Sequence, residues 1–165
     1  MKILSILILF LGLTLNAQSS KSIAVTGDVT QPVIINFSDL KNYQQHSVDS
    51  LPIYNHKMEY KSTLKKIKGV LLKDVLAKVD FKTDSPKFLS EFYLVCIADD
   101  GYKAVFSWNE IFNSANGDQV LILTELDGSD ASKLKENIML VTPTDKATGR
   151  RYVKNFSKIL IQKVN

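Results

Sequence analysis

One turn between two apolar runs carries the side chains best suited to contact a small molecule. Asp99, Asp100 and Tyr102 lie in an acidic-glycine turn that follows the apolar run 92–98. Two carboxylates and a phenol at a sheet edge could exchange protons or hydrogen-bond a polar ligand. The alternative is a plain turn, in which Asp bonds its own backbone and Gly101 supplies a positive φ. Taken alone, the turn favours this structural interpretation.

A second loop, near the C-terminus, gathers positive charge. It contains Lys146, Arg150, Arg151 and Lys154. Convergent cations of this kind bind phosphate or carboxylate groups. A solvated loop is the alternative for the Arg150–Arg151 pair.

Residue types that bind metals are sparse and far apart. His46 and His56 lie in a polar segment, and Cys96 is the single cysteine. Structural zinc sites use closely spaced Cys and His ligands, so we predict no metal site. Cys96 stands inside the run 92–98, where we expect a buried, inert thiol. One cysteine can form no disulfide within the chain.

Common catalytic motifs are absent from the sequence. There is no Gly-x-Ser-x-Gly nucleophile motif, and the glycines are isolated rather than gathered in a phosphate-binding loop. We therefore assign no catalytic residue. The formal net charge is +4, and the lysines are densest over residues 61–68. No aromatic residues are interleaved there, so we expect a solvated face and no nucleic-acid binding.

The N-terminus has the pattern of a secretory signal peptide over residues 1–17. Lys2 precedes an apolar run over residues 3–15, and Ala17 offers a small residue for cleavage. The run is shorter than the roughly 20 apolar residues of a membrane span. An uncleaved N-terminal anchor is the alternative. We expect residues 18–165 to form a single domain, periplasmic or secreted, with no membrane span.

Strand patterns recur along the mature chain. Short apolar or alternating runs predict strands over residues 22–29, 33–37, 88–106 as a pair, 119–126, 138–142 and 151–164. The last of these is expected to close the sheet. The polar segment 44–55 has no clear period and is expected to be a loop.

Helix patterns are fewer and shorter. An apolar face predicts a helix over residues 70–79, and Ser38 is expected to cap a brief helix over 39–43. Ser107 and Glu110 have the spacing of a capping box, which predicts a helical turn from Trp108. Strands outnumber helices, which indicates an α+β fold with a mixed, mostly antiparallel sheet.

Four segments together resemble the molybdopterin-binding oxidoreductase domain, which has the sulfite-oxidase-type fold. They are Gly69-Val-Leu-Leu-Lys-Asp-Val-Leu76, Asp100-Gly-Tyr102, the strand 121–128 that ends in Asp-Gly, and Leu140-Val-Thr-Pro143 through Val153-Lys154. The resemblance covers nearly the whole mature chain. It implies that the α+β fold is that of the sulfite-oxidase molybdopterin domain.

The chain departs from this family at the residues that would hold molybdenum. The enzymes bind the metal through a cysteine before the Gly-Val helix, but residues 46–68 contain no cysteine and no arginine. His56 stands roughly at the position of that cysteine. Met139 replaces a cofactor-facing arginine, and Asn155 replaces a tryptophan. Since molybdenum needs a soft thiolate, we expect a relative that keeps the scaffold without the metal.

The resemblance implies an exported, non-catalytic module that binds a pterin-like or other small planar ligand, with a pterin or molybdopterin as the candidate cofactor. In this interpretation Tyr102 or Trp108 stacks on the ring, and Asp99 or Asp100 grips the aminopyrimidine edge. The full set of expected ligand-binding residues is Asp99, Asp100, Tyr102, Trp108, His56, Arg150 and Lys154. A membrane sensor or a redox protein is the expected partner.

Two other functions are compatible with the sequence. One is a molybdenum-cofactor-dependent oxidoreductase, or a subunit of one, whose metal is held without the usual cysteine. The other is a partner-binding module with no small ligand, in which the turn at 99–102 is purely structural.

Overall fold

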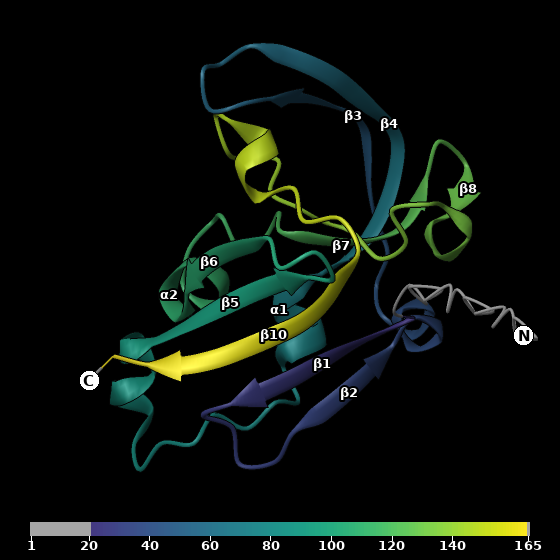
Figure 1. Cartoon of the computed structure of the whole chain (residues 1–165). Helices are drawn as coiled ribbons and strands as arrows, with labels where there is room; N and C mark the ends of the chain where they lie inside the picture. The colour runs from purple at the N-terminus through teal and green to yellow at the C-terminus, as the bar shows by residue number, and fades with distance from the viewer. Residues whose placement is uncertain (1–20, 165) are drawn as a thin grey trace, which may run out of the picture.

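The computed structural model of the chain describes residues 21–164, which form two β-sheets with short helices (Figure 1). The expected signal peptide, residues 1–17, lies outside the described residues. Within the described range, no helix has the length and apolar character that a membrane crossing requires.

The first sheet has five strands, and its central strand comes from the C-terminus. Its spatial order is β2 (Val33–Asn36), β1 (Ser22–Gly27), β10 (Phe156–Lys163), β5 (Phe92–Ala98) and β6 (Lys103–Ser107). Only β1 and β10 pair in parallel; the other neighbours are antiparallel. The prediction that residues 151–164 close the sheet is therefore wrong, because β10 lies between β1 and β5.

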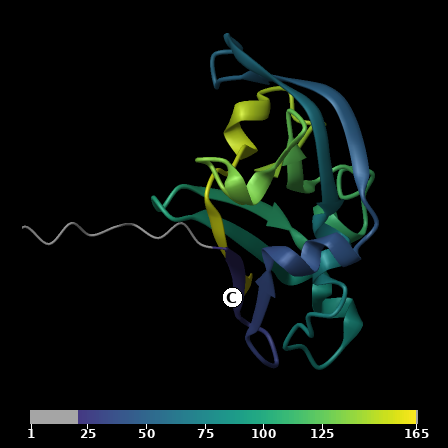
Figure 2. The same ribbon diagram turned by 90° about the vertical axis from the view of Figure 1, so that its right-hand side faces the viewer.

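The second sheet is built on a long hairpin. Its strands are β3 (His46–Tyr54), β4 (Tyr60–Leu71), β7 (Leu121–Leu126) and β8 (Ser129–Asp130), and β9 (Leu140–Val141) pairs with β7. The hairpin of β3 and β4 arches over the C-terminal 3-10 helix η4 (Thr148–Arg151), which Figures 1 and 2 both show. All pairs in this sheet are antiparallel. The predicted α+β class is thus confirmed.

The strand β3 contradicts the predicted loop over residues 44–55. It is an edge strand that, among the described residues, pairs with no strand but β4, and it buries only Leu51 and Ile53. Pro52 is tolerated because an edge strand need not donate every backbone N–H. A mostly polar strand held by pairing with a distant partner gives no clear period in the sequence.

The predicted helix over residues 70–79 is shorter than expected. Residues 70 and 71 instead continue β4 and pair with β7, and the helix α1 covers Leu72–Leu76. Gly69 permits this pairing, since a Cβ there would lie 2.6 Å from the backbone oxygen of Ile122. Strand residues buried on both faces read as a continuous apolar run, which imitates a buried helix.

Short helices complete the fold. The helix α2 (Trp108–Phe112) begins at the predicted capping box, with both reciprocal hydrogen bonds of Ser107 and Glu110 present. The 3-10 helix η1 (Phe37–Asn42) has Asn36 as its N-cap rather than Ser38. Two further 3-10 helices are η2 (Pro86–Glu91) and η3 (Ala131–Lys133).

One hydrophobic core is shared by strands of both sheets and by the helices α1 and α2. Phe92, Phe106 and Phe156 are among its largest fully buried side chains. Cys96 is also fully buried, on β5 between Ile159 of β10 and Ala104 of β6, which confirms the expected core position of this thiol.

The central position of β10 can be tested by core truncation. Ile159 is fully buried, whereas its neighbour Leu160 points to the other, more open face. We expect Ile159→Ala to lower the free energy of unfolding by about 2–5 kcal/mol, because it leaves a cavity. Leu160→Ala should cost no more than about 1 kcal/mol. Urea denaturation measures both, and equal losses would contradict the assignment of faces.

Candidate functional site

A cleft of about 480 Å³ lies beside the tip of the β3–β4 hairpin. Its walls come from the hairpin, from the turn before β6, and from η4 with the residues that follow it. The lining residues are Ile53, Tyr54, Asn55, His56, Lys61, Ser62, Tyr102, Gly149, Arg150, Tyr152 and Lys154. The structure thus brings together four of the predicted ligand-binding residues, namely His56, Tyr102, Arg150 and Lys154.

The 3-10 helix η4 is fixed to β3 by the buried Thr148. Its Oγ1 accepts a hydrogen bond from the Tyr54 N–H at 3.0 Å and donates one to the Pro52 carbonyl at 2.7 Å. Gly149 allows the two backbones to approach, because a Cβ there would lie 2.8 Å from the Tyr54 oxygen. These contacts hold the next residue, Arg150, at the mouth of the cleft.

Tyr102 closes the opposite side of the cleft. Its hydroxyl donates a hydrogen bond to the Arg150 backbone oxygen, and its own N–H donates to Asp100 Oδ1 at 2.9 Å. Gly101 has a φ of +85°, as the turn requires. Asp100 therefore acts on the backbone of its own turn. Neither Asp99 nor Asp100 lines the cleft.

Positive charge dominates the cleft. Lys61, Arg150 and Lys154 line it, and no lining residue is Asp or Glu. Lys61 pairs with Glu59 at 3.0 Å and Lys154 with Glu136 at 3.6 Å, both at the exposed surface. Such pairs contribute roughly 0–1 kcal/mol and exchange readily for a ligand. Within residues 21–164 no carboxylate pairs with Arg150, so its guanidinium is available to an anion.

Three tyrosines supply flat apolar surface in the same cleft. Tyr54, Tyr102 and Tyr152 line it, and the Lys154 ammonium lies 5.1 Å from the centre of the Tyr152 ring. The Tyr152 hydroxyl donates to Met139 Sδ at 3.3 Å. Burial, together with the charge of Glu136, raises the pKa of Tyr152 to about 12. Its phenol is therefore neutral at physiological pH and offers an uncharged ring face.

Sequence reasoning missed several lining residues, among them Lys61, Tyr54 and Tyr152. In the sequence Lys61 belongs to the run of solvated lysines over residues 61–68, and the local pattern does not predict the hairpin that carries it to the cleft. Tyr152 was counted among the alternating residues of a strand that begins only at Phe156. Its position two residues after Arg150 was the one available signal.

The second arginine of the pair has a structural role. Arg151 donates to Asp145 from Nε at 2.8 Å and from Nη2 at 2.5 Å, and to Glu110 Oε1 from Nη1 at 2.8 Å. Its guanidinium also lies 4.3 Å from the centre of the Phe106 ring. These hydrogen bonds, those to Asp145 first, raise the pKa of Arg151 above its usual value. Arg151 joins the C-terminal loop to α2 and β6 and does not line the cleft.

The two arginines should differ sharply in their effect on stability. Arg151→Met keeps an apolar stem over Phe106 but leaves Asp145 without its ion pair. We expect a loss of about 2 kcal/mol, less than a fully buried pair would give because Arg151 retains some solvent contact. Arg150→Met, the matched control, should change stability by less than about 0.5 kcal/mol. Urea unfolding measures both, and equal losses would show that Arg151 is not the anchor.

Trp108 lies outside this cleft. It lines a second cavity of about 600 Å³ and stacks on Phe112 with ring centres 5.2 Å apart. The structure therefore separates Trp108 from the other predicted aromatic residue, Tyr102.

The side chains of the cleft fit an anionic, flat ligand but not molybdenum. Cys96 is the single thiol of the chain, is fully buried, and does not line the cleft. Burial raises the pKa of Cys96 to about 12, so the thiolate that molybdenum requires is strongly disfavoured. Within residues 21–164, no three His, Cys, Asp or Glu side chains are grouped closely enough to hold a metal ion.

The burial of Cys96 predicts its chemical reactivity. At pH 8 a fully buried thiol with a raised pKa should not react with Ellman's reagent, because only an accessible thiolate attacks the disulfide. The folded protein should release almost no thionitrobenzoate in the time in which protein in 6 M guanidinium chloride releases one equivalent. Rapid reaction of the folded protein would contradict the core assignment.

Comparisons with known proteins support the fold. No family model and no curated protein matches the chain. Among solved structures, the sulfane dehydrogenase SoxCD from Paracoccus pantotrophus superposes on 88% of this chain with a TM-score of 0.64 and 16% sequence identity. The chain spans only 39% of the length of that protein's chain. At this sequence identity the similarity establishes a related fold. The function has to be argued from the residues of the site.

Proposed function

We propose that this chain is an exported module that binds a small, flat, anionic ligand of the pterin class without transforming it. The observation that carries the proposal is the convergence of Lys61, Arg150 and Lys154 with three tyrosines in one cleft. The related fold of a dehydrogenase and the sequence resemblance to molybdopterin-binding domains both support a scaffold suited to pterins.

The chemistry of the cleft suits each part of such a ligand. Its volume of about 480 Å³ lies within the roughly 300–1,000 Å³ of small-molecule sites. A guanidinium such as that of Arg150 can bind a phosphate or carboxylate in a bidentate manner. The tyrosine faces offer offset stacking to a bicyclic ring, and tyrosine hydroxyls offer hydrogen bonds to its edge.

The lining supports binding rather than catalysis. It contains no carboxylate and no thiol. The groups that remain position and neutralise an anion. We infer that occupancy of the cleft is transmitted to a partner protein, either a membrane sensor or a redox protein.

Ligand binding can be tested with a panel of reduced and oxidised pterins that carry phosphate or carboxylate tails. We expect at least one to raise the melting temperature of the protein, because binding to the native state alone stabilises it. Arg150→Gln should weaken that binding at least tenfold. The control Lys146→Gln removes an exposed charge of the same loop that does not line the cleft, and should bind normally. A panel without any shift would remove the pterin from the proposal.

A second candidate, an oxidoreductase that uses a molybdenum cofactor, is favoured by the fold shared with a dehydrogenase. Its cofactor would be held without the usual cysteine or with the help of another subunit, because Cys96 is buried. Metal analysis of protein purified from its native host separates the two functions. The binding-module proposal predicts no molybdenum above background, and a stoichiometric amount would overturn it.

A further inference from the structure

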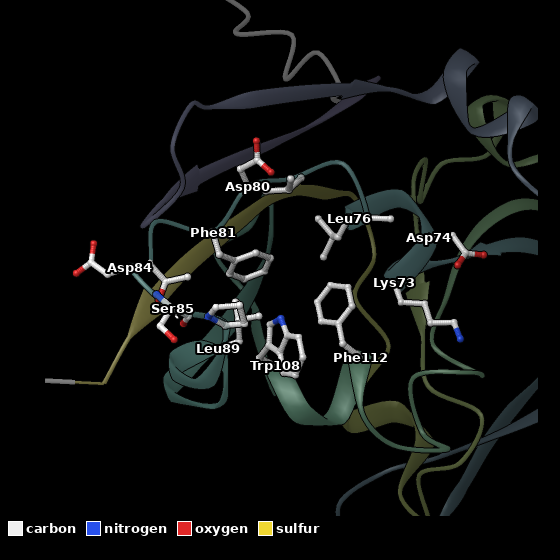
Figure 3. A pocket seen from close by; sticks show the side chains of 14 residues that line it. Lys73, Asp74, Leu76, Asp80, Phe81, Asp84, Ser85, Leu89, Trp108 and Phe112 are labelled. Carbon is white, nitrogen blue, oxygen red and sulfur yellow. Dashed lines mark hydrogen bonds between the residues drawn. The ribbon is translucent and has the colours of Figure 1, made fainter.

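The second cavity, of about 600 Å³, is an apolar cleft on the helical side of the first sheet (Figure 3). It lies between α1, the segment 79–86, η2 and α2. Leu76, Phe81, Leu89, Trp108 and Phe112 line it, and Figure 3 shows their side chains gathered at its centre. It shares no lining residue with the cleft at the hairpin, so nothing in the proposed function uses it.

The aromatic floor of this cavity is fixed in place. Phe81 meets Phe112 edge to face at 6.0 Å and meets the buried Phe92 edge to face at 5.5 Å. Trp108 stacks on Phe112, and the capping box at Ser107 sets the start of the helix that carries both rings. The rings therefore form a preformed apolar surface, which lowers the entropic cost of binding a partner.

The rim of the cavity is acidic, although the chain as a whole carries a formal charge of +4. Asp74, Asp80 and Asp84 contribute to the lining, and Figure 3 shows their carboxylates around the outside of the ring cluster. The lining contains one cation, Lys73, and its ammonium is bonded to Asp118. Lys73 also interacts with the charge of Asp74, so the rim carboxylates that no cation of the lining neutralises are those of Asp80 and Asp84.

We propose that this cavity docks a peptide segment of a partner protein in which a large apolar side chain lies next to lysine or arginine. The apolar side chain would fill the space over Phe81 and Phe112, and the cations would reach the carboxylates of the rim. Figure 3 shows the indole nitrogen of Trp108 on the edge of its ring that faces Phe81 and Phe112. From there the N–H can donate to a peptide carbonyl. The cavity is broadly open to solvent, so an extended peptide can reach it.

The fluorescence of Trp108 reports occupancy directly, because it is the only tryptophan of the chain. The probe is acetyl-Lys-Leu-Lys-Leu-Lys-amide, which contains no tryptophan, titrated into the full mature chain with excitation at 295 nm. We expect a saturable shift of the emission to shorter wavelength as water leaves the indole. The charge-reversed peptide with glutamates, and the peptide with serines in place of leucines, should each bind at least tenfold more weakly.

Variants of the protein test whether the fluorescence change arises from peptide bound in this cavity. The double variant Asp80→Lys/Asp84→Lys changes two exposed rim carboxylates and should weaken binding of the basic peptide at least tenfold. The matched control Asp39→Lys/Asp49→Lys makes the same change of charge at exposed positions outside the cavity, and should bind normally. Ala77→Arg places a bulky cation at an exposed lining position and should abolish the response.

Three results would overturn the proposal. One is an equal response to the acidic and basic peptides, and another is normal binding by Asp80→Lys/Asp84→Lys. The third is binding of 2-phenylethylammonium as tightly as the peptide, which would assign the site to a small organic cation. The comparison of peptides uses the wild-type chain, so it decides the matter even if a variant does not fold.

Discussion

The guanidinium of Arg151 is the contact on which the candidate site depends. It binds Asp145 within its own loop and Glu110 of α2, and it covers the Phe106 ring of β6. Glu110 also closes the capping box of α2, so a single carboxylate ties the helix to the C-terminal loop. With Arg151 directed inward, its neighbour Arg150 is left at the surface, facing the cleft. Arg151 thus fixes the loop in place, and Arg150 lines the cleft that this loop helps to form.

The same short segment joins the two sheets. Thr148 in η4 bonds the backbone of β3 in the second sheet, and Tyr102, in the turn before β6 of the first sheet, bonds the Arg150 carbonyl. The shape of the cleft therefore depends on hydrogen bonds that join the C-terminal loop to both sheets. The elements that carry its cations are fixed by these hydrogen bonds, and a site on fixed elements is suited to holding an anion. The related dehydrogenase shows that the frame is shared, but the buried Cys96 shows that this chain does not offer the metal a thiolate from its core.

Short sequence motifs predicted the local structure correctly. They could not predict which strands pair when those strands lie far apart in the sequence. The capping box of α2 and the core position of Cys96 each depend on a few neighbouring residues, and both are confirmed. The polar edge strand β3 has no such signal, because its pairing with β4 supplies the order that its own residues lack. Because the hairpin of β3 and β4 could not be predicted, the position of Lys61 in the cleft could not be predicted either. Resemblance to a family suggested His56 and Lys154 for the cleft, but it could not show that Trp108 belongs to a separate cavity.

The central claim is that an anionic pterin occupies the cleft between the hairpin and η4. Nitrogen-15 chemical-shift mapping of labelled protein, residues 18–165, titrated with a pterin phosphate, tests it most directly. The account predicts shifts concentrated in residues 53–62, at Tyr102 and in residues 149–154, with the indole signal of Trp108 unchanged. A saturable binding event whose shifts cluster around Trp108 and Phe81, or anywhere outside the cleft, would contradict it.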